Sequence, residues 1–425
     1  MLSERKNLME KTRERISEEL SGLKSQTGLH LQLNRTVFEL LNKRVEGHLG
    51  VRSYFVHALS RYIQRQAELE GLPMKRRPQD LFDTQLPLLA EGIITVQYLE
   101  NQILDGKDQT RSCEKEAPKQ RRDQKLLASH YVKDFLYDYI DNKILPDDLE
   151  DKRLVARTVR RIFRYVDLGQ MMQDEWGTYD WFKQGHKGDI SISPEIDAFL
   201  NKPIIRLHWK KIGSKGINSR HVNFMRNYLR RIYLTSGALF VMLAELEMDL
   251  LGYEGKERNN IINAAASIGI IGQMVNDICD FVPHPTVAKE AEDVFSDIRN
   301  DIVTLPLALY FDRNPNKEIK DLKELAKSAF QAFAETKFQK IPGTKLFLGM
   351  KPALLSSMEI VKELRECSRI FFDESLPEGI LLEDMNSVVD KRENRILRFW
   401  VPQLEALTPP KMSAERKPQP KPVAA

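Results

Sequence analysis

Two oxygen-bearing side chains in this sequence have a spacing that suits a divalent cation. Asn276 and Asp280 lie one helical turn apart. Side chains at positions i and i+4 share one face of a helix, and two oxygen ligands there can hold a hard cation such as Mg²⁺. An ordinary solvent-facing helix also carries Asn and Asp, so this pair alone leaves both interpretations open.

The helix that would position this pair is amphipathic. Between 268 and 281 the apolar residues recur at helical spacing, while Gln273, Asn276, Asp277 and Asp280 fall on the polar side. Prolines at 283 and 285 are expected to end it. A second helix start follows at 304–307, with Asp297 between the two helices.

A second polar pair lies earlier in the chain. Asn101 and Asp105 stand four residues apart near the end of a helical pattern over 86–108. Taken alone, this segment is as well explained by an exposed helix with ordinary polar residues. Further on, Gly237 lies inside a helical pattern, where it marks either a kink or a close contact between helices.

Composition limits the classes of function. Lysine plus arginine number 65 and aspartate plus glutamate 61, a balance that gives no argument for nucleic-acid binding. The three cysteines, Cys113, Cys279 and Cys367, share no metal-ligand spacing, and their odd number fits a reduced, cytoplasmic protein. We expect Cys279 to pack in the core. The sequence predicts neither a signal peptide nor a transmembrane segment.

Helical periodicity dominates the chain, which predicts an all-α protein. We divide it into a charged N-terminal helical extension (1–30), a helical domain (31–407) and a disordered tail rich in Pro and Lys (408–425). Within the domain, residues 178–219 contain several Gly and Pro and are predicted to form an irregular insertion, either a surface loop or a lid.

The order of these motifs resembles that of the trans-isoprenyl diphosphate synthases, within the class I isoprenoid synthase superfamily. The second aspartate-rich region of that family resembles Gln273, Asn276-Asp277-x-x-Asp280 and the later Thr304-Leu305-Pro306. Its first region resembles Asn101-Gln-x-x-Asp105. Further matches stand in the family's order: Arg52, Gly169-Gln170, Thr235-x-Gly237 and Asp297. Three family lysines are replaced, by Leu49, Leu234 and Ile302.

The resemblance implies a fold and a set of ligands. The fold would be a helical bundle around a deep apolar cavity, whose mouth binds Mg²⁺ and a prenyl diphosphate. The implied residues are listed by role: metal ligands Asn101, Asp105, Asn276, Asp277 and Asp280, of which Asp105, Asn276 and Asp280 are catalytic; diphosphate ligands Arg52, Arg111, Gln273 and Arg299. Metal ions and basic side chains stabilise the charge that develops on a leaving diphosphate.

Three functions follow from the resemblance. A terpene synthase-like enzyme ionises one allylic diphosphate and then cyclises it or eliminates a proton, so it needs no second diphosphate site. A chain-elongating prenyltransferase needs that second site, and the replacements at Leu49, Leu234 and Ile302 count against it. A catalytically degenerate partner subunit of a prenyl synthase is the third. The first is favoured; substrate length, product and assembly as a homodimer or heteromer stay open.

Overall fold

The computed structural model describes residues 10, 14, 18, 51–104, 118–145, 148–185, 194–201, 203–213, 221–282, 294–335, 340–341, 343–368 and 401–407. Helices make up nearly all of this part of the chain, and it contains no β-strand, only an isolated antiparallel bridge between Thr178 and Ile302. The prediction of an all-α protein is confirmed. Much of the proposed 1–30 extension and the whole 408–425 tail lie outside these residues.

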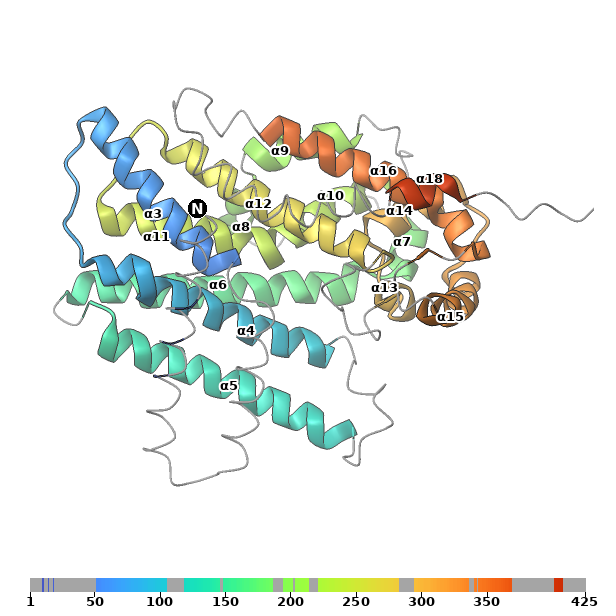
Figure 1. Cartoon of the computed structure of the whole chain (residues 1–425), viewed down its shortest axis with the longest axis horizontal. Helices are drawn as coiled ribbons and strands as arrows, with labels where there is room; N and C mark the ends of the chain where they lie inside the picture. The colour runs from blue at the N-terminus through green and yellow to red at the C-terminus, as the bar shows by residue number, and fades with distance from the viewer. Residues whose placement is uncertain are drawn as a thin grey trace, which may run out of the picture.

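The helices form one bundle (Figure 1). Their bounds are α3 Val51–Glu70, α4 Leu86–Leu104, α5 Pro118–Lys143, α6 Leu149–Trp176, α7 Tyr179–Gln184, α8 Pro194–Leu200, α9 Pro203–Gly213, α10 Val222–Ile232, α11 Ala238–Leu251, α12 Arg258–Cys279, α13 Ser296–Arg299, α14 Leu305–Arg313, α15 Ile319–Glu335, α16 Lys345–Ser368 and α18 Val401–Ala406. Short π-helical turns precede α4 (η1, Leu81–Gln85) and α11 (η4, Tyr233–Gly237).

Helix α6 shows how the sequence sets an element. Asp148 caps its start, because the Asp148 carboxylate accepts a hydrogen bond from the backbone N–H of Asp151. Val155, Val159 and Ile162 then repeat at helical spacing and are buried. The helix ends at Trp176, and the backbone N–H of its C-cap residue Gly177 donates to the Gln173 carbonyl.

Helix α12 is the most buried of the long helices. It is the one helix in the described part of the chain that is long and apolar enough to cross a membrane, and 78% of its apolar window is buried inside the bundle. Burial on that scale is typical of a central core helix. The helix ends at Cys279, a few residues before the prolines that were expected to end it, and Cys279 is buried as predicted.

Gly237 ends the π-helical turn η4 between α10 and α11, so the helix is modified there and not broken. The same glycine packs against α12. A Cβ atom placed on Gly269 would lie 2.5 Å from the Cα atom of Gly237 and 2.7 Å from the carbonyl oxygen of Ser236. The interpretation of Gly237 as a close contact between helices is therefore confirmed.

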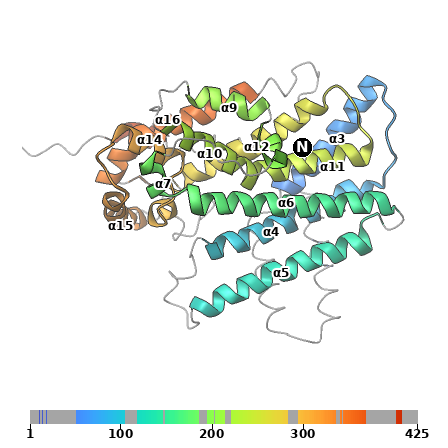
Figure 2. The same ribbon diagram turned by 180° about the vertical axis from the view of Figure 1, so that it is seen from behind.

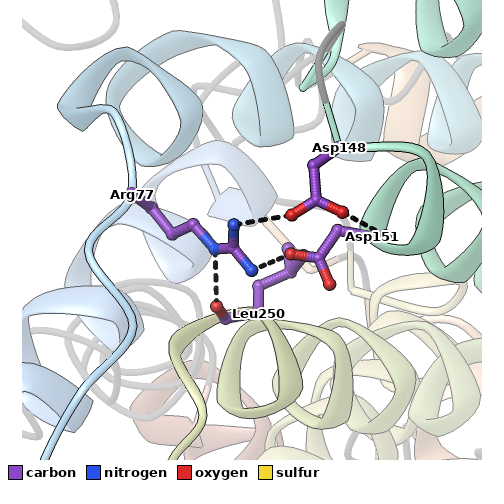
Figure 3. Close-up of polar contacts among 4 residues, drawn as sticks. All are labelled: Arg77, Asp148, Asp151 and Leu250. Atoms are coloured by element: carbon purple, nitrogen blue, oxygen red, sulfur yellow. Dashed lines mark hydrogen bonds and ion pairs between the residues drawn. The ribbon is translucent and has the colours of Figure 1, made fainter.

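A partly buried polar clamp, formed by Arg77, Asp148, Asp151 and Leu250, joins three segments of the chain (Figure 3). The Arg77 guanidinium donates to the Leu250 carbonyl at 2.9 Å and to the Asp148 carboxylate at 3.0 Å, and it also pairs with Asp151. Only 12% of the Arg77 side chain is exposed. The clamp fixes the loop before α4, the start of α6 and the end of α11 to one another.

The segment 178–219 differs from the prediction of an irregular insertion where it is described. It contains three helices, α7, α8 and α9, which begin at or just after a capping or proline residue: Thr178, Pro194 and Pro203. Proline fixes the backbone angle needed in a first helical turn, so several of the residues interpreted as loop signals are helix starts.

Candidate functional site

One end of the bundle gathers the polar residues of interest. Helices α4, α6 and α12 finish there and α10 begins there, as both views of the bundle show (Figures 1 and 2). Asn101 is in the last turn of α4, and Asn276 is in the last turn of α12. The two helices that carry the predicted metal-binding pairs thus finish at the same end of the bundle.

Asn101 and Asn276, the first residues of the two pairs, have side-chain oxygens that accept no hydrogen bond from another described residue. The side-chain oxygen of Asn101 is buried and has no hydrogen-bond partner. Asn276 is half-buried, and no hydrogen bond joins its side chain to another described residue. A buried amide oxygen without a partner costs free energy, which a cation or another ligand would recover.

Asp277 is held by a chain of hydrogen bonds from two helices. Its carboxylate accepts from the Tyr228 hydroxyl at 2.7 Å and from the Gln273 amide at 2.9 Å. The Gln273 oxygen in turn accepts from the Ser236 hydroxyl at 2.9 Å. This chain joins α10, η4 and α12, so Asp277 and Gln273 have fixed orientations.

Asp280 connects α12 to the segment that follows it. Its carboxylate accepts from the backbone N–H of Ser296 at 3.0 Å, from the Ser296 hydroxyl at 2.7 Å and from the backbone N–H of Asp297 at 3.3 Å. Asp297 accepts from the Thr304 hydroxyl at 2.9 Å. Asp280 and Asp297 therefore hold the backbone between α12 and α14 in position through these hydrogen bonds.

Two residues that the sequence analysis missed are buried beside this network. Asn227 and Arg231 lie one turn apart on α10 and are only 3% and 4% exposed. The Arg231 guanidinium lies over the Tyr228 ring, 5.1 Å from its centroid. Burial, and next the nearby Asp277 carboxylate, raise the pKa of Tyr228 well above its usual value, while Arg231 acts in the opposite direction.

The signal for these two residues was present in the sequence. Phe224, Asn227 and Arg231 follow helical spacing, so the apolar face of α10 includes two polar positions. A polar residue on an apolar helix face indicates either a buried partner or a ligand. Sequence alone does not distinguish a buried face from an exposed one in a helix with as many arginines as α10 contains.

A small pocket lies between the end of α6 and α10. It is small and partly open to solvent, and its lining residues are Met172, Trp176, Gly177, Phe224, Asn227, Tyr228 and Arg231. The backbone around Gly177 holds this wall in place, because the Gly177 carbonyl accepts from the Val303 N–H at 2.7 Å. The deep apolar cavity that was expected from the resemblance stays a prediction.

The remaining predicted ligands are distributed as follows. Arg52 is half-buried in the first turn of α3, and Arg299 is exposed at the end of α13. Asp105 and Arg111 lie outside the described residues. Leu234 and Ile302, at two of the replaced lysine positions, are buried. Both side chains are apolar, so neither supplies the charge that a lysine would.

The residues present fit a magnesium ion only in part. The unpartnered amide oxygen of Asn101 and the uncommitted side chain of Asn276 are suitable hard donors. The Asp277 and Asp280 carboxylates already accept hydrogen bonds, but each carboxylate has about four lone-pair sites, so those bonds orient them without filling them. Within the described residues no three His, Cys, Asp or Glu side chains form a metal-binding group.

Comparison with known proteins identifies the fold. Residues 210–340 match the family model described as Polyprenyl synthetase. Geranylgeranyl pyrophosphate synthase from Corynebacterium glutamicum, complexed with isoprenyl diphosphate and magnesium, has a TM-score of 0.59 at 14% identity, and the match covers 91% of this chain and 98% of that one.

Two further solved structures have a fold similar to that of this chain. Heptaprenyl diphosphate synthase from Staphylococcus aureus gives a TM-score of 0.57 at 14% identity, covering 92% of this chain and 98% of that one. Decaprenyl diphosphate synthase from Rhodobacter capsulatus gives a TM-score of 0.54 at 14% identity, and the match covers 92% of this chain and 99% of that one. No curated protein matches the chain by sequence.

Proposed function

This chain has the fold of the prenyl diphosphate synthases, and we propose that it is a Mg²⁺-dependent enzyme of the terpene synthase type. It would bind one allylic prenyl diphosphate at the end of the bundle where α4 and α12 finish. The observation that carries the proposal is that the side-chain oxygens of Asn101 and Asn276, on those two helices, have no partner within the described part of the chain. The similar C. glutamicum structure is a complex with isoprenyl diphosphate and magnesium.

The residues take the following roles in this proposal. Asn101, Asp105 and Asn276 are the principal metal ligands, with Asp277 and Asp280 completing the set from α12. Arg52, Arg111, Gln273 and Arg299 contact the diphosphate. Bound Mg²⁺ would supply charge stabilisation for the departing diphosphate. Gln273 and Asp277 are held in position by Ser236 and Tyr228, so no reorganisation of these groups accompanies the reaction.

The reaction is a heterolytic cleavage. The allylic C–O bond breaks, its electron pair leaves with the diphosphate, and the carbocation then loses a proton to give a hydrocarbon or captures water to give an alcohol. The apolar side chains of the core would keep the carbocation dry. No second diphosphate is needed, which agrees with the buried Leu234 and Ile302 at two replaced lysine positions.

A specific observation favours a second candidate, a non-catalytic partner of an active prenyl synthase. The Asp280 carboxylate accepts three hydrogen bonds from the backbone and side chain that follow α12, and the first position of each metal-binding pair is a neutral Asn. A protein that keeps the fold but no longer holds metal would show these features too.

One experiment separates the candidates. The purified protein is incubated with allylic diphosphates of ten, fifteen and twenty carbons, with and without isopentenyl diphosphate, Mg²⁺ and a chelator. We expect Mg²⁺-dependent release of inorganic diphosphate and a hydrocarbon or alcohol, with no acceleration by isopentenyl diphosphate. A longer prenyl diphosphate as the main product would identify a chain-elongating prenyltransferase. No turnover alone, together with stimulation of an added prenyl synthase, would identify the partner subunit.

A further inference from the structure

The exposed face of α6 carries a straight row of side chains, most of them basic. Helix α6 runs along the outside of the bundle (Figure 2). Seven of its exposed residues repeat every three or four positions: Leu149, Arg153, Arg157, Arg160, Arg164, Asp167 and Met171. At about 100° per residue these positions fall within an arc of about 80°. They therefore form one line along the helix, which we call the α6 basic row.

The arginines of the α6 basic row are not balanced by neighbouring acids. Arg153, Arg157 and Arg164 form no hydrogen bond or ion pair with another described residue. Arg160 lies over the Tyr137 ring, 5.3 Å from its centroid. The row contains one carboxylate, which comes after all four arginines. Four positive charges thus lie along about 16 Å of helix surface.

This concentration of charge is not a consequence of composition. The chain has 65 basic and 61 acidic residues, which nearly cancel. Exposed like charges in one line repel one another, and an arrangement of that kind on a folded surface suits an acidic partner. The two ends of the row are apolar, because Leu149 is 59% exposed and Met171 is 57% exposed.

We propose that the α6 basic row binds an acidic helix of another protein. Consecutive arginines of the row lie one helical turn apart, about 5.4 Å along the axis. A partner helix laid along α6 presents carboxylates at the same repeat, so each guanidinium can pair with one. Leu149 and Met171 would pack against apolar side chains at the ends of the partner helix.

The surroundings of the row favour a narrow partner. The neighbouring helix α5 packs beside α6 and exposes three acidic side chains, Asp134, Asp138 and Asp141. A flat anionic membrane or the backbone of a nucleic acid would extend past α6, and its negative charges would be repelled by these aspartates. A single helix is only about 10 Å wide, so it can contact α6 alone.

A second copy of this chain fits the row less well than a different protein does. If two copies met through α6 across a twofold axis, each arginine row would face the other. Like charges placed opposite one another oppose association. The inference rests on the charge and exposure of α6, so it does not depend on the proposed function.

The test measures binding of two synthetic peptides of identical composition to the full chain. In the first peptide, four Glu residues share one helical face at the spacing of the four arginines, on an Ala and Gln background with Leu at both ends. In the second, the same residues are permuted so that the Glu residues are spread around the helix. Fluorescence anisotropy should show that the first binds about tenfold more tightly. The difference should shrink at about 0.3 M NaCl, because salt screens exposed charges.

Two double variants make the test specific. Arg157→Glu with Arg164→Glu reverses two charges of the row at side chains that hold nothing else in the described part of the chain. It should weaken binding of the first peptide about tenfold or more, with an unchanged melting temperature. Arg206→Glu with Lys210→Glu makes the same change of net charge at two exposed residues of α9, and it should bind like the wild type.

The outcomes decide the proposal. Equal binding of the two peptides, or unchanged binding by the row variant, would overturn it. If charge reversal unfolds the protein, Arg157→Gln with Arg164→Gln replaces it, and unchanged binding by that variant overturns the proposal in the same way. Two parallel measurements on the row variant look for other occupants. A dimer in sedimentation equilibrium that this variant loses would assign the row to a second copy. Wild-type binding to phosphatidylserine-containing vesicles but not to the first peptide would assign it to an anionic membrane. Failure of the terpene synthase assay would leave all of these results interpretable.

Discussion

Two buried arginines, one at each end of the bundle, differ in what surrounds them. Arg77 donates to the Leu250 carbonyl and pairs with Asp148 and Asp151, so its charge and its donors are matched within the chain. Arg231 is buried more deeply, and no described carboxylate forms an ion pair with it, although its guanidinium lies over the Tyr228 ring. The first arrangement stabilises a fold, whereas the second leaves interactions for a ligand.

The same contrast separates the residues of the α12 end. The Asp280 carboxylate accepts hydrogen bonds from three protein donors, while the Asn276 side chain has no partner among the residues that the structure describes. In this molecule, the number of protein partners of a buried polar group therefore separates groups that hold the fold from candidates that bind. Each of the following predictions tests that rule, in order of decreasing expected effect.

The largest effect is expected at the clamp. Arg77→Met leaves Asp148 and Asp151 without their cation, and breaking a buried ion pair costs about 3 kcal/mol or more. Urea unfolding followed by circular dichroism measures this loss. Arg76→Met, at the exposed neighbouring residue, is the control and should change stability little. Equal stability of the two variants would mean that the number of partners of a buried arginine does not predict its structural role.

The second prediction compares Asn276→Ala with Asp280→Ala. Asn276→Ala should lower diphosphate release about a hundredfold, the effect of removing an electrostatic stabiliser, with no loss of stability. Asp280→Ala should lower both the diphosphate release and the stability. The substitution removes the carboxylate that accepts hydrogen bonds from the Ser296 N–H, the Ser296 hydroxyl and the Asp297 N–H. Product assays and thermal unfolding on the same samples separate the two effects. A destabilised Asn276→Ala would contradict the rule.

The hydrogen bonds of Asp280 show where reasoning from the sequence stops. The spacing of Asn276 and Asp280 placed them near one another, at the end of α12, but it gave no sign of the contacts that Asp280 makes. The partner of Asp280 is Ser296, 16 residues further on. A contact made across an intervening segment leaves no periodic signal, so its stabilising role could be recognised only in the structure.

The sequence predicted the fold more completely than it predicted the candidate site. Helical periodicity gave the all-α class, and the order of weak motifs gave the prenyl synthase fold that the structural comparisons confirm. Arg231 and Asn227 were missed because their significance depends on which face of α10 is buried. Asp105 and Arg111 stay predictions.

The third prediction uses two glycines of α12. In Gly269→Ala the new methyl group would meet the backbone of Gly237 and Ser236, so we expect a loss of about 1 to 3 kcal/mol. Because Ser236 donates to Gln273, the product assay should also weaken. Gly272→Ala is the matched control. It has open space at that position and should be neutral or slightly more stable, as measured by urea unfolding.

The smallest effect is expected at Glu247, a buried carboxyl group that becomes neutral when it binds a proton. Glu247 on α11 is fully buried, and neither carboxyl oxygen has a hydrogen-bond partner. Burial raises the pKa of Glu247 well above its usual value, so the folded state keeps the carboxyl protonated under conditions where the unfolded chain releases the proton. The folded state then binds more protons, and the free energy of unfolding falls as pH rises above the ordinary glutamate range.

Glu247→Gln removes this dependence, because an amide does not titrate. The variant should therefore gain stability relative to the wild type as pH is raised from 4 to 8, and the two should be most alike at the acidic end. Glu245→Gln, two residues earlier on the same helix and half-buried, should leave the pH dependence of the wild type unchanged. Urea unfolding at several pH values measures the difference. Parallel curves for Glu247→Gln and the wild type would show that Glu247 is ionised in the folded state, and that a partner outside the described residues holds its charge.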